Sequence, residues 1–233
     1  MVDSRMERSG GYAGIAFIVL AILAALVPGL PPPPDAPVIQ VGAYLAVRHT
    51  AWLFAGWLVL PQIAFFLWFL VQLRAHLQHT LHEDDGLPTF LLTGGVVAGT
   101  IALLLGLVQV VMVFDPVWQL GRPLVRVLFD IYNAGGAFIF LPTSVFLFAA
   151  SQSGLRHGTL PNALVTWGYI AAFGAAISTL TVFATSGFFA MGGAATLIFG
   201  FIPLAIWTIW TSLVLMAPPR AVETTQAVSR PIA

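Results

Sequence analysis

Six stretches of this chain are apolar enough to cross a lipid bilayer, and this pattern restricts the fold more than any motif does. A helix needs about 20 mostly apolar residues to span the hydrocarbon core, and an open strand there could not satisfy its backbone hydrogen bonds. The stretches cover residues 12–27, 51–73, 90–114, 127–150, 163–184 and 194–216. The sequence therefore predicts an all-α, polytopic transmembrane bundle of six helices in one domain, residues 1–216, followed by a disordered cytoplasmic tail, residues 217–233.

The connection between the first two predicted spans begins with four consecutive prolines, Pro31 to Pro34. Because proline cannot continue a helix, these residues end the first span and start an extended, polyproline-like segment. The apolar run before them ends without a small-residue cleavage motif, which favours an uncleaved helix over a secretory signal. The following stretch, residues 38–50, fits either an interfacial helix or an early extension of the second span.

Arginine placement predicts the orientation of the bundle, because short cytoplasmic loops carry an excess of positive charge. With the N-terminus inside, the cytoplasmic arginines are Arg5, Arg8, Arg74, Arg156, Arg220 and Arg230. The external arginines are Arg48, Arg122 and Arg126. The majority on the first side predicts that both termini are cytoplasmic.

Charge balance and two missing residue types exclude several classes of function. The nine basic residues are all arginine and are balanced by nine acidic residues, which leaves no positive surplus for binding the phosphate backbone of nucleic acid. Without cysteine the chain can form no disulfide, no thiolate nucleophile and no iron–sulfur cluster. Without lysine it can form no Schiff base and cannot complete a phosphate-binding P-loop.

Polar residues inside the fourth predicted span mark the candidate functional site. Arg126 and Asp130 are four residues apart and Asn133 is three further on, so all three lie on one side of a helix. Ionisable residues inside a membrane are costly and often functional. The predicted topology brings Arg48, His49 and Gln109 to the same outer half of the membrane.

Two interpretations of this cluster remain open. In the first, Arg126 and Asp130 form an ion pair that fixes the helix at the membrane surface, and Asn133 bonds a neighbouring helix. In the second, an outward-facing cavity uses Arg126 and Arg48 to attract an anionic headgroup or carboxylate, while Asp130 takes a proton or a hydrogen bond.

A histidine-rich segment at the inner end of the second span offers weak metal-ligand candidates. His76 and His79 are three residues apart and Glu83 follows His79 by four, which is compatible with zinc ligands on a helix. No H-E-x-x-H motif is present, and a solvated helix end explains the segment better. A haem held by His76 and His157 is the remaining alternative, and it lacks the paired histidines of a transmembrane cytochrome. We therefore expect no metal and no cofactor.

Several segments resemble a group of uncharacterised six-span membrane proteins of high-GC actinobacteria. The similar segments are "YLAVRH", "FFLWFLVQLRAHL", "GG" at residues 94–95, "DIYNAGGAFIFLP" and "HGTLPNAL". They cover most of the chain from Tyr44 to the fifth span. The resemblance implies a six-span fold and a multi-pass protein of a bacterial cytoplasmic membrane, and it implies no activity.

Three classes of function follow from these observations. The first is binding or transport of a lipid-like or small amphipathic molecule in the outer half of the bundle. The second is a non-catalytic accessory or assembly subunit whose polar cluster contacts another membrane protein or a second copy. The third and least favoured is an intramembrane enzyme or redox subunit that uses Asp130 or histidine chemistry. Membrane lipids are expected partners in each case.

Overall fold

The computed structural model describes residues 4–78, 86–114 and 121–217, and these residues form helices and connecting turns without a strand. The helices are α1 (Ser4–Leu26), α2 (Val38–Val47), α3 (His49–Gln78), α4 (Leu87–Phe114), α6 (Arg122–Phe138), α7 (Phe140–His157), α8 (Asn162–Ser178), the short helices η1 (Thr179–Phe183) and η2 (Thr196–Phe201), and α9 (Ile202–Met216). The predicted all-α class is confirmed.

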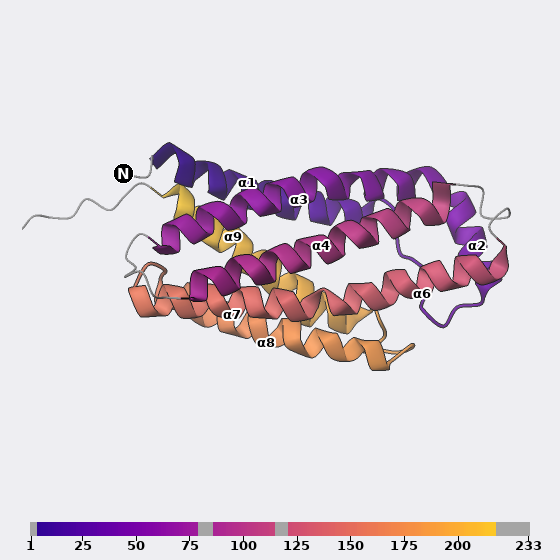
Figure 1. The fold of residues 1–233 in the computed structure, drawn as a ribbon. Helices are drawn as coiled ribbons and strands as arrows, with labels where there is room; N and C mark the ends of the chain where they lie inside the picture. Colours follow the sequence, from indigo (N-terminus) through magenta and orange to yellow (C-terminus); the bar gives the residue numbers. More distant parts are fainter. Residues whose placement is uncertain (1–3, 79–85, 115–120, 218–233) are drawn as a thin grey trace, which may run out of the picture.

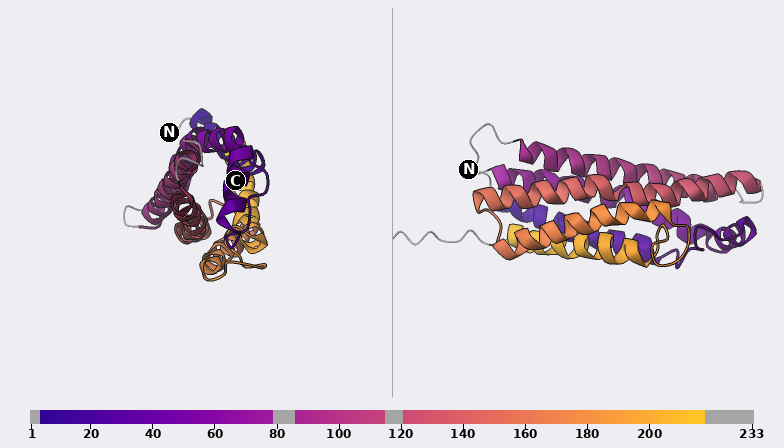
Figure 2. Two further views of the ribbon diagram at one scale, coloured as in Figure 1. Left: turned by 90° about the vertical axis from the view of Figure 1, so that its right-hand side faces the viewer. Right: turned by 90° about the horizontal axis from the view of Figure 1, so that it is seen from below.

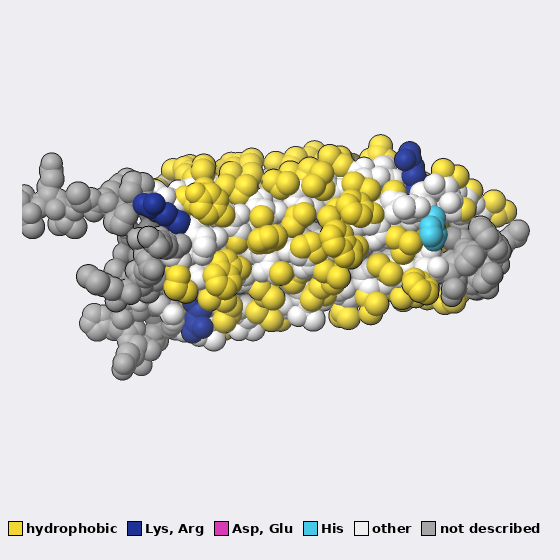
Figure 3. Space-filling view, turned by 90° about the horizontal axis from the view of Figure 1, so that it is seen from above, with side chains coloured by type: hydrophobic (Ala, Val, Ile, Leu, Met, Phe, Trp, Pro, Cys, Tyr) yellow, Lys and Arg dark blue, Asp and Glu magenta, His cyan; other side chains and the backbone are white. Residues whose placement is uncertain are grey.

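Six helical segments are long and apolar enough to cross a membrane, which confirms the expectation of a multi-pass membrane protein. They are Arg8–Leu26, His49–Gln78, Leu87–Phe114, Pro123–His157, Asn162–Phe183 and Thr196–Met216. The space-filling view shows arginine atoms near the two ends of the molecule and a broad hydrophobic band between them (Figure 3). The tail that the sequence predicts to be disordered lies outside the described residues, except for Ala217.

The six spans form a closed ring, in which neighbours along the sequence are also neighbours in space (Figure 2). α1 packs on α3, α3 on α4, and α4 on α6 and α7. α7 then packs on α8, α8 on α9, and α9 returns to α1. Both ends of the described chain lie at one end of this ring, since a side chain on Gly11 would touch Met216. We call this the terminal end, and the other the α2 end.

The fourth span consists of two helices, α6 and α7, that meet at Ile139. Pro142 explains the break, because a proline has no N–H to donate to the carbonyl four residues earlier, that of Phe138, and its ring crowds that carbonyl. The side chain of Thr143 donates a 2.8 Å hydrogen bond to the carbonyl of Ile139. Arg126, Asp130 and Asn133 of the predicted site all lie on α6, on the α2 side of this break.

α2 is a separate ten-residue helix and not the start of α3, so the structure decides between the two alternatives for residues 38–50. Arg48 ends it, with a backbone φ of −101° and ψ of 14° that leaves helical geometry. Apolar side chains of this segment, among them Ala36, Val41 and Leu45, are buried against α3, α4 and α6. α2 therefore covers one end of the ring of helices (Figure 1).

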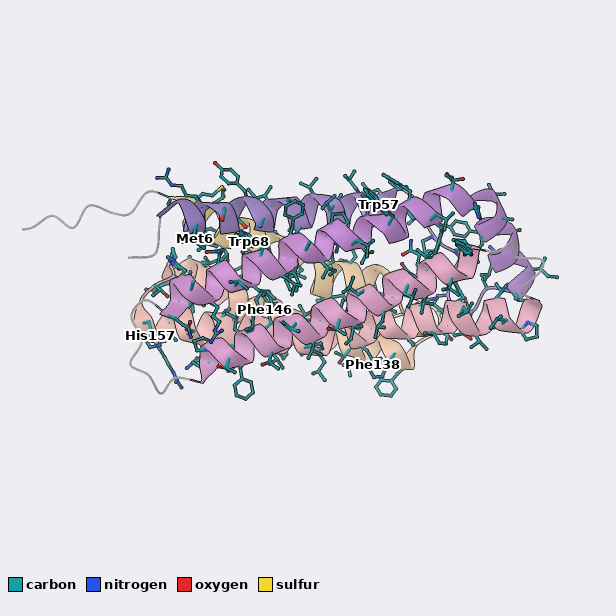
Figure 4. The ribbon with its side chains drawn as sticks, turned by 45° about the horizontal axis from the view of Figure 1, so that its top comes forward. Met6, Trp57, Trp68, Phe138, Phe146 and His157 are labelled. Atoms are coloured by element: carbon teal, nitrogen blue, oxygen red, sulfur yellow. The ribbon has the colours of Figure 1, made fainter. Side chains whose placement is uncertain are left out.

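The apolar core is divided into two clusters along the ring axis. The cluster near α2 includes Trp52, Met112 and Phe129. The cluster toward the terminal end contains edge-to-face aromatic rings, with Phe146 5.4 Å from Trp207 between ring centroids. Phe146 lies among the helices, whereas Phe138 and Trp57 lie on the outside of the bundle (Figure 4). Phe17 and Phe66 of this second cluster also line one of the cavities described next.

Candidate functional site

Arg126 fastens the proline-rich segment to α6. Its Nε donates a 2.9 Å hydrogen bond to Oδ2 of Asp130, one turn later on the same helix. Its Nη1 donates to the carbonyl of Ala36 at 2.9 Å, and its Nη2 donates to the carbonyl of Pro34 at 2.6 Å. Prolines have no N–H, so the segment cannot form a regular hydrogen-bonding ladder. The planar guanidinium supplies donors to its free carbonyls instead.

Tyr44 makes a second attachment of the same segment. Its hydroxyl donates to the carbonyl of Pro28 at 2.9 Å and lies 3.3 Å from the carbonyl of Gly29. Burial raises the pKa of Tyr44 above its ordinary value, and contacts with Trp52 and the positive charge of Arg48 partly offset this effect. The neutral phenol is the form that can donate these bonds. We call residues 28–47 the strap.

A cavity of about 250 Å³ with several polar side chains in its wall lies between α3, α4, α6 and η2. Its lining includes the side chains of Gln62, Gln109, Tyr132, Asn133 and Thr196, together with several apolar residues and glycines. Its described walls carry no charged side chain. We call this space the polar compartment.

An apolar cavity of about 140 Å³ adjoins the polar compartment toward the terminal end. Aromatic side chains dominate its lining: Phe17, Phe66, Phe140, Phe146 and Phe201. Gln62, Ala102 and Ile139 line both cavities, so the two share a boundary. The molecule thus has a chamber with one polar and one apolar compartment, set side by side inside the ring.

Two buried amides in the polar compartment each have an oxygen with no donor among the described residues. Asn133 is 9% exposed, and its Nδ2 donates to the carbonyl of Phe129 on its own helix at 2.8 Å, leaving Oδ1 open. Gln109 is 5% exposed, and its Nε2 donates to the carbonyl of Trp52 at 3.1 Å, leaving Oε1 open. Both oxygens can therefore accept a hydrogen bond from a molecule in the cavity. Oγ1 of Thr196, in the same wall, is buried and has no hydrogen-bond partner among the described residues, so it can donate or accept such a bond.

The loop between η1 and η2 and the helix that follows it complete this wall. Gly192 has a φ of 68°, which a side chain rarely adopts, and lies beside Oδ1 of Asn133. η2 has π-helical geometry, and such segments often occur at functional sites. Pro203, which follows η2 closely, cannot donate to the carbonyl of Phe199 and so favours this irregular geometry.

The structure separates the six predicted site residues into three groups. Arg126 and Asp130 form the ion pair described above, and about a third to a half of each side chain is exposed. Gln109 and Asn133 line the chamber, and Asn133 bonds its own helix and not a neighbouring one. The remaining two, Arg48 and His49, lie at the junction of α2 and α3, outside the described lining of the chamber.

Arg48 is held away from Arg126 by this geometry. It is exposed, and its Nη2 lies near Gly29, where an added Cβ would be 3.8 Å away. Three donor groups of Arg126, meanwhile, are engaged by Asp130 and the strap. Neither arginine is among the residues that line the two cavities described above, and the anion-binding interpretation stays a prediction.

The weak metal candidates are only partly within the described residues. His76 lies near the end of α3, whereas His79 and Glu83 fall in the segment 79–85, which the structure does not describe. Among the described ranges, no group of three metal-ligating side chains is found.

Sequence reasoning missed three polar residues of the polar compartment: Gln62, Tyr132 and Thr196. Gln62 follows Pro61 in the middle of an apolar span, and this position could have identified it. Tyr132 belongs to the same short motif as Asp130 and Asn133. No sequence signal marks Thr196, because its position depends on how the loop before η2 folds back.

A larger groove of about 630 Å³ lies on the outside of the bundle, between α4, α7 and α8. Phe90, Phe148 and Phe173 line it and are more than half exposed. In a membrane protein such a surface is in contact with lipid chains. The groove has few polar groups, so it offers less basis for specific recognition than the internal chamber does.

No protein-family model, curated protein or solved structure matches this chain.

Proposed function

We propose that this protein binds a lipid-like or small amphipathic molecule in the chamber and is a carrier or receptor for it in the membrane. The observation that carries the proposal is the shared boundary between a polar and an apolar compartment inside one ring of helices. An amphipathic molecule has this same division, with a polar head that hydrogen-bonds and a chain that packs against aromatic rings. The polar compartment is the part of the chamber nearer to α2, and the apolar compartment is the part nearer to the terminal end.

The chamber can be blocked without disturbing its surroundings. Gly136 lines the polar compartment, and a Cβ added there would have no heavy atom within 4 Å. Gly136→Leu should therefore fill part of the compartment while the helices keep their positions. Ile131→Phe is the matched control, because residue 131 lies on the exposed side of the same helix.

Native mass spectrometry of the gently solubilised protein tests the proposal. We expect the wild-type chain and Ile131→Phe to retain a small molecule that Gly136→Leu loses. Equal retention by all three would place the molecule outside the chamber and contradict the proposal.

The same measurement separates the two other classes of function. A stable second protein in place of a small molecule would favour the accessory-subunit alternative. A visible absorption band would indicate haem, as the redox alternative requires. Unpaired polar atoms in the chamber support binding over both: Oγ1 of Thr196 is buried without a partner among the described residues, and the amide oxygens of Asn133 and Gln109 are free to accept.

We also propose that the terminal end of the ring faces the cytoplasm of a bacterial cell. Arg8, Arg74 and Arg156 belong to this end, whereas Arg48 and Arg126 belong to the α2 end. The excess of arginine on the cytoplasmic side in known membrane proteins supports this orientation. The strap and the polar compartment would then belong to the outer half of the membrane.

A further inference from the structure

The lining of the polar compartment indicates which chemical class of head group the bound molecule has. We infer that this head is uncharged and donates hydrogen bonds, as a hydroxyl or a primary amide does, and that carboxylates, phosphates and ammonium groups are rejected. This inference rests on the proposed function and specifies its ligand class.

The first argument is the lack of a countercharge. No charged residue is found among the described residues that line the polar compartment. A charge moved from water into such a space is strongly disfavoured unless an opposite charge or several hydrogen bonds compensate it. Arg126 does not supply that charge, because its guanidinium is directed to Asp130 and to the strap carbonyls of Pro34 and Ala36.

The second argument is the direction of the hydrogen bonds. Oδ1 of Asn133 and Oε1 of Gln109 are acceptors without a donor among the described residues. A carboxylate or a fully ionised phosphate has only acceptor oxygens, so it could accept from the hydroxyls of Tyr132 and Thr196 but could not pair with these two amide oxygens. A hydroxyl or an amide N–H donates to them, and its own oxygen can accept from the hydroxyl of Tyr132, which also lines the compartment.

The third argument is size. The polar compartment has a volume of about 250 Å³, which is below the roughly 300–1,000 Å³ of typical small-molecule pockets. A compact head matches this space better than a large, strongly hydrated one does. The adjoining apolar compartment of about 140 Å³ takes the first carbons of a chain.

Three probes with the same chain length and different head groups distinguish a neutral head from a negatively or a positively charged one. We would incubate the full-length protein in lipid nanodiscs, near neutral pH, with 1-decanol, decanoate or decylammonium, and measure bound probe by native mass spectrometry. Gly136→Leu gives the background from the lipid and the outer surface. Binding in the chamber is the difference between wild type and this variant.

We expect chamber binding of 1-decanol to exceed that of each ion by at least about tenfold at equal free concentration. Equal or stronger chamber binding of decanoate or decylammonium would overturn the inference and leave the proposed function standing. Equal binding of all three probes to wild type and Gly136→Leu would overturn the proposed function itself.

A second variant tests the hydrogen-bond argument within the compartment. Asn133→Leu keeps a similar shape and removes the open acceptor, and the bond it loses in the fold is only that to Phe129 on the same helix. We expect 1-decanol binding to fall by roughly two- to tenfold, the range of one hydrogen bond. An unchanged affinity, in a variant whose thermal stability matches wild type, would count against donation to Asn133. Unfolding of this variant would leave the three-probe comparison as the deciding measurement.

Discussion

Nε of Arg126 donates a 2.9 Å hydrogen bond to Oδ2 of Asp130, and this ion pair orients a guanidinium whose other two nitrogens hold the strap. Asp130 accepts one of the three hydrogen bonds that Arg126 donates, and the side chains of both residues are partly exposed. Arg126 therefore attaches the strap directly, and Asp130 supports this attachment by orienting the guanidinium.

Arg126→Gln and Asp130→Asn should have unequal effects on stability. The first loses three hydrogen bonds of a partly exposed charged group and should cost about 1–3 kcal/mol. The second keeps the bonds to the strap and should cost at most about 1 kcal/mol, as exposed ion pairs do. Thermal unfolding in detergent, with hydrogen exchange over residues 28–47, measures both. Equal losses would show that the ion pair and not the strap contacts dominates.

Asp130→Asn also tests the earlier alternative in which this carboxylate takes a proton from a ligand or a bond to it. We expect the variant to retain the bound molecule at the wild-type level, because Asp130 is not among the described residues that line the chamber. Loss of the molecule from a correctly folded variant would restore a binding role for the carboxylate.

Tyr44 should make the strap sensitive to alkaline pH. Burial raises the pKa of Tyr44 in the folded protein, so the folded state holds the phenol proton more tightly than the unfolded chain. Its contribution is fully present below the ordinary tyrosine pKa of about 10 and is lost as the pH rises above it.

Tyr44→Phe removes the hydroxyl that donates to Pro28, and should cost about 1 kcal/mol near pH 8. The difference in stability between wild type and this variant should shrink above about pH 10. A difference that stays constant across this range would show that the phenol proton does not matter. Protection of strap amides from hydrogen exchange is the readout.

Two helical glycines should respond in opposite ways to the addition of a methyl group. A Cβ on Gly168 would lie 2.0 Å from Oγ of Ser151 and 2.7 Å from Nε1 of Trp207, so Gly168→Ala should destabilise by about 1–3 kcal/mol. Gly136→Ala meets open space and should be neutral, or stabilising by up to about 1 kcal/mol, through reduced backbone entropy of the unfolded chain.

Thermal unfolding of both alanine variants checks this contrast. Adding Ser151→Ala to Gly168→Ala should restore part of the loss, because it removes the closer of the two atoms. A stable Gly168→Ala variant would mean that α7 and α8 can separate locally at low cost.

The absence of cysteine allows a direct test of orientation. Leu30, at the start of the strap, is 94% exposed, and Gly86, before α4, has no heavy atom near its Cβ position. If the terminal end is cytoplasmic, a membrane-impermeant maleimide should label Leu30→Cys in intact cells and Gly86→Cys only after permeabilisation. The reverse labelling would invert the proposed orientation.

The sequence by itself determined the class of this protein, because a run of apolar side chains long enough to cross a bilayer leaves helices as the only economical backbone structure. It also placed Arg126, Asp130 and Asn133 on one side of a helix, since residues three and four apart share a face. Both properties depend only on the spacing of residues along the chain, which the sequence gives directly.

Only the tertiary structure decided what each polar residue does. Arg126 bonds carbonyls about 90 residues earlier in the chain, and nothing in the spacing of the sequence indicates that contact. Gln62 and Thr196 reach the wall of the chamber because the ring closes and the loop before η2 folds back. A cavity is set by the packing of several helices at once, and this packing joined Asn133 and Gln109 while it left Arg48 outside.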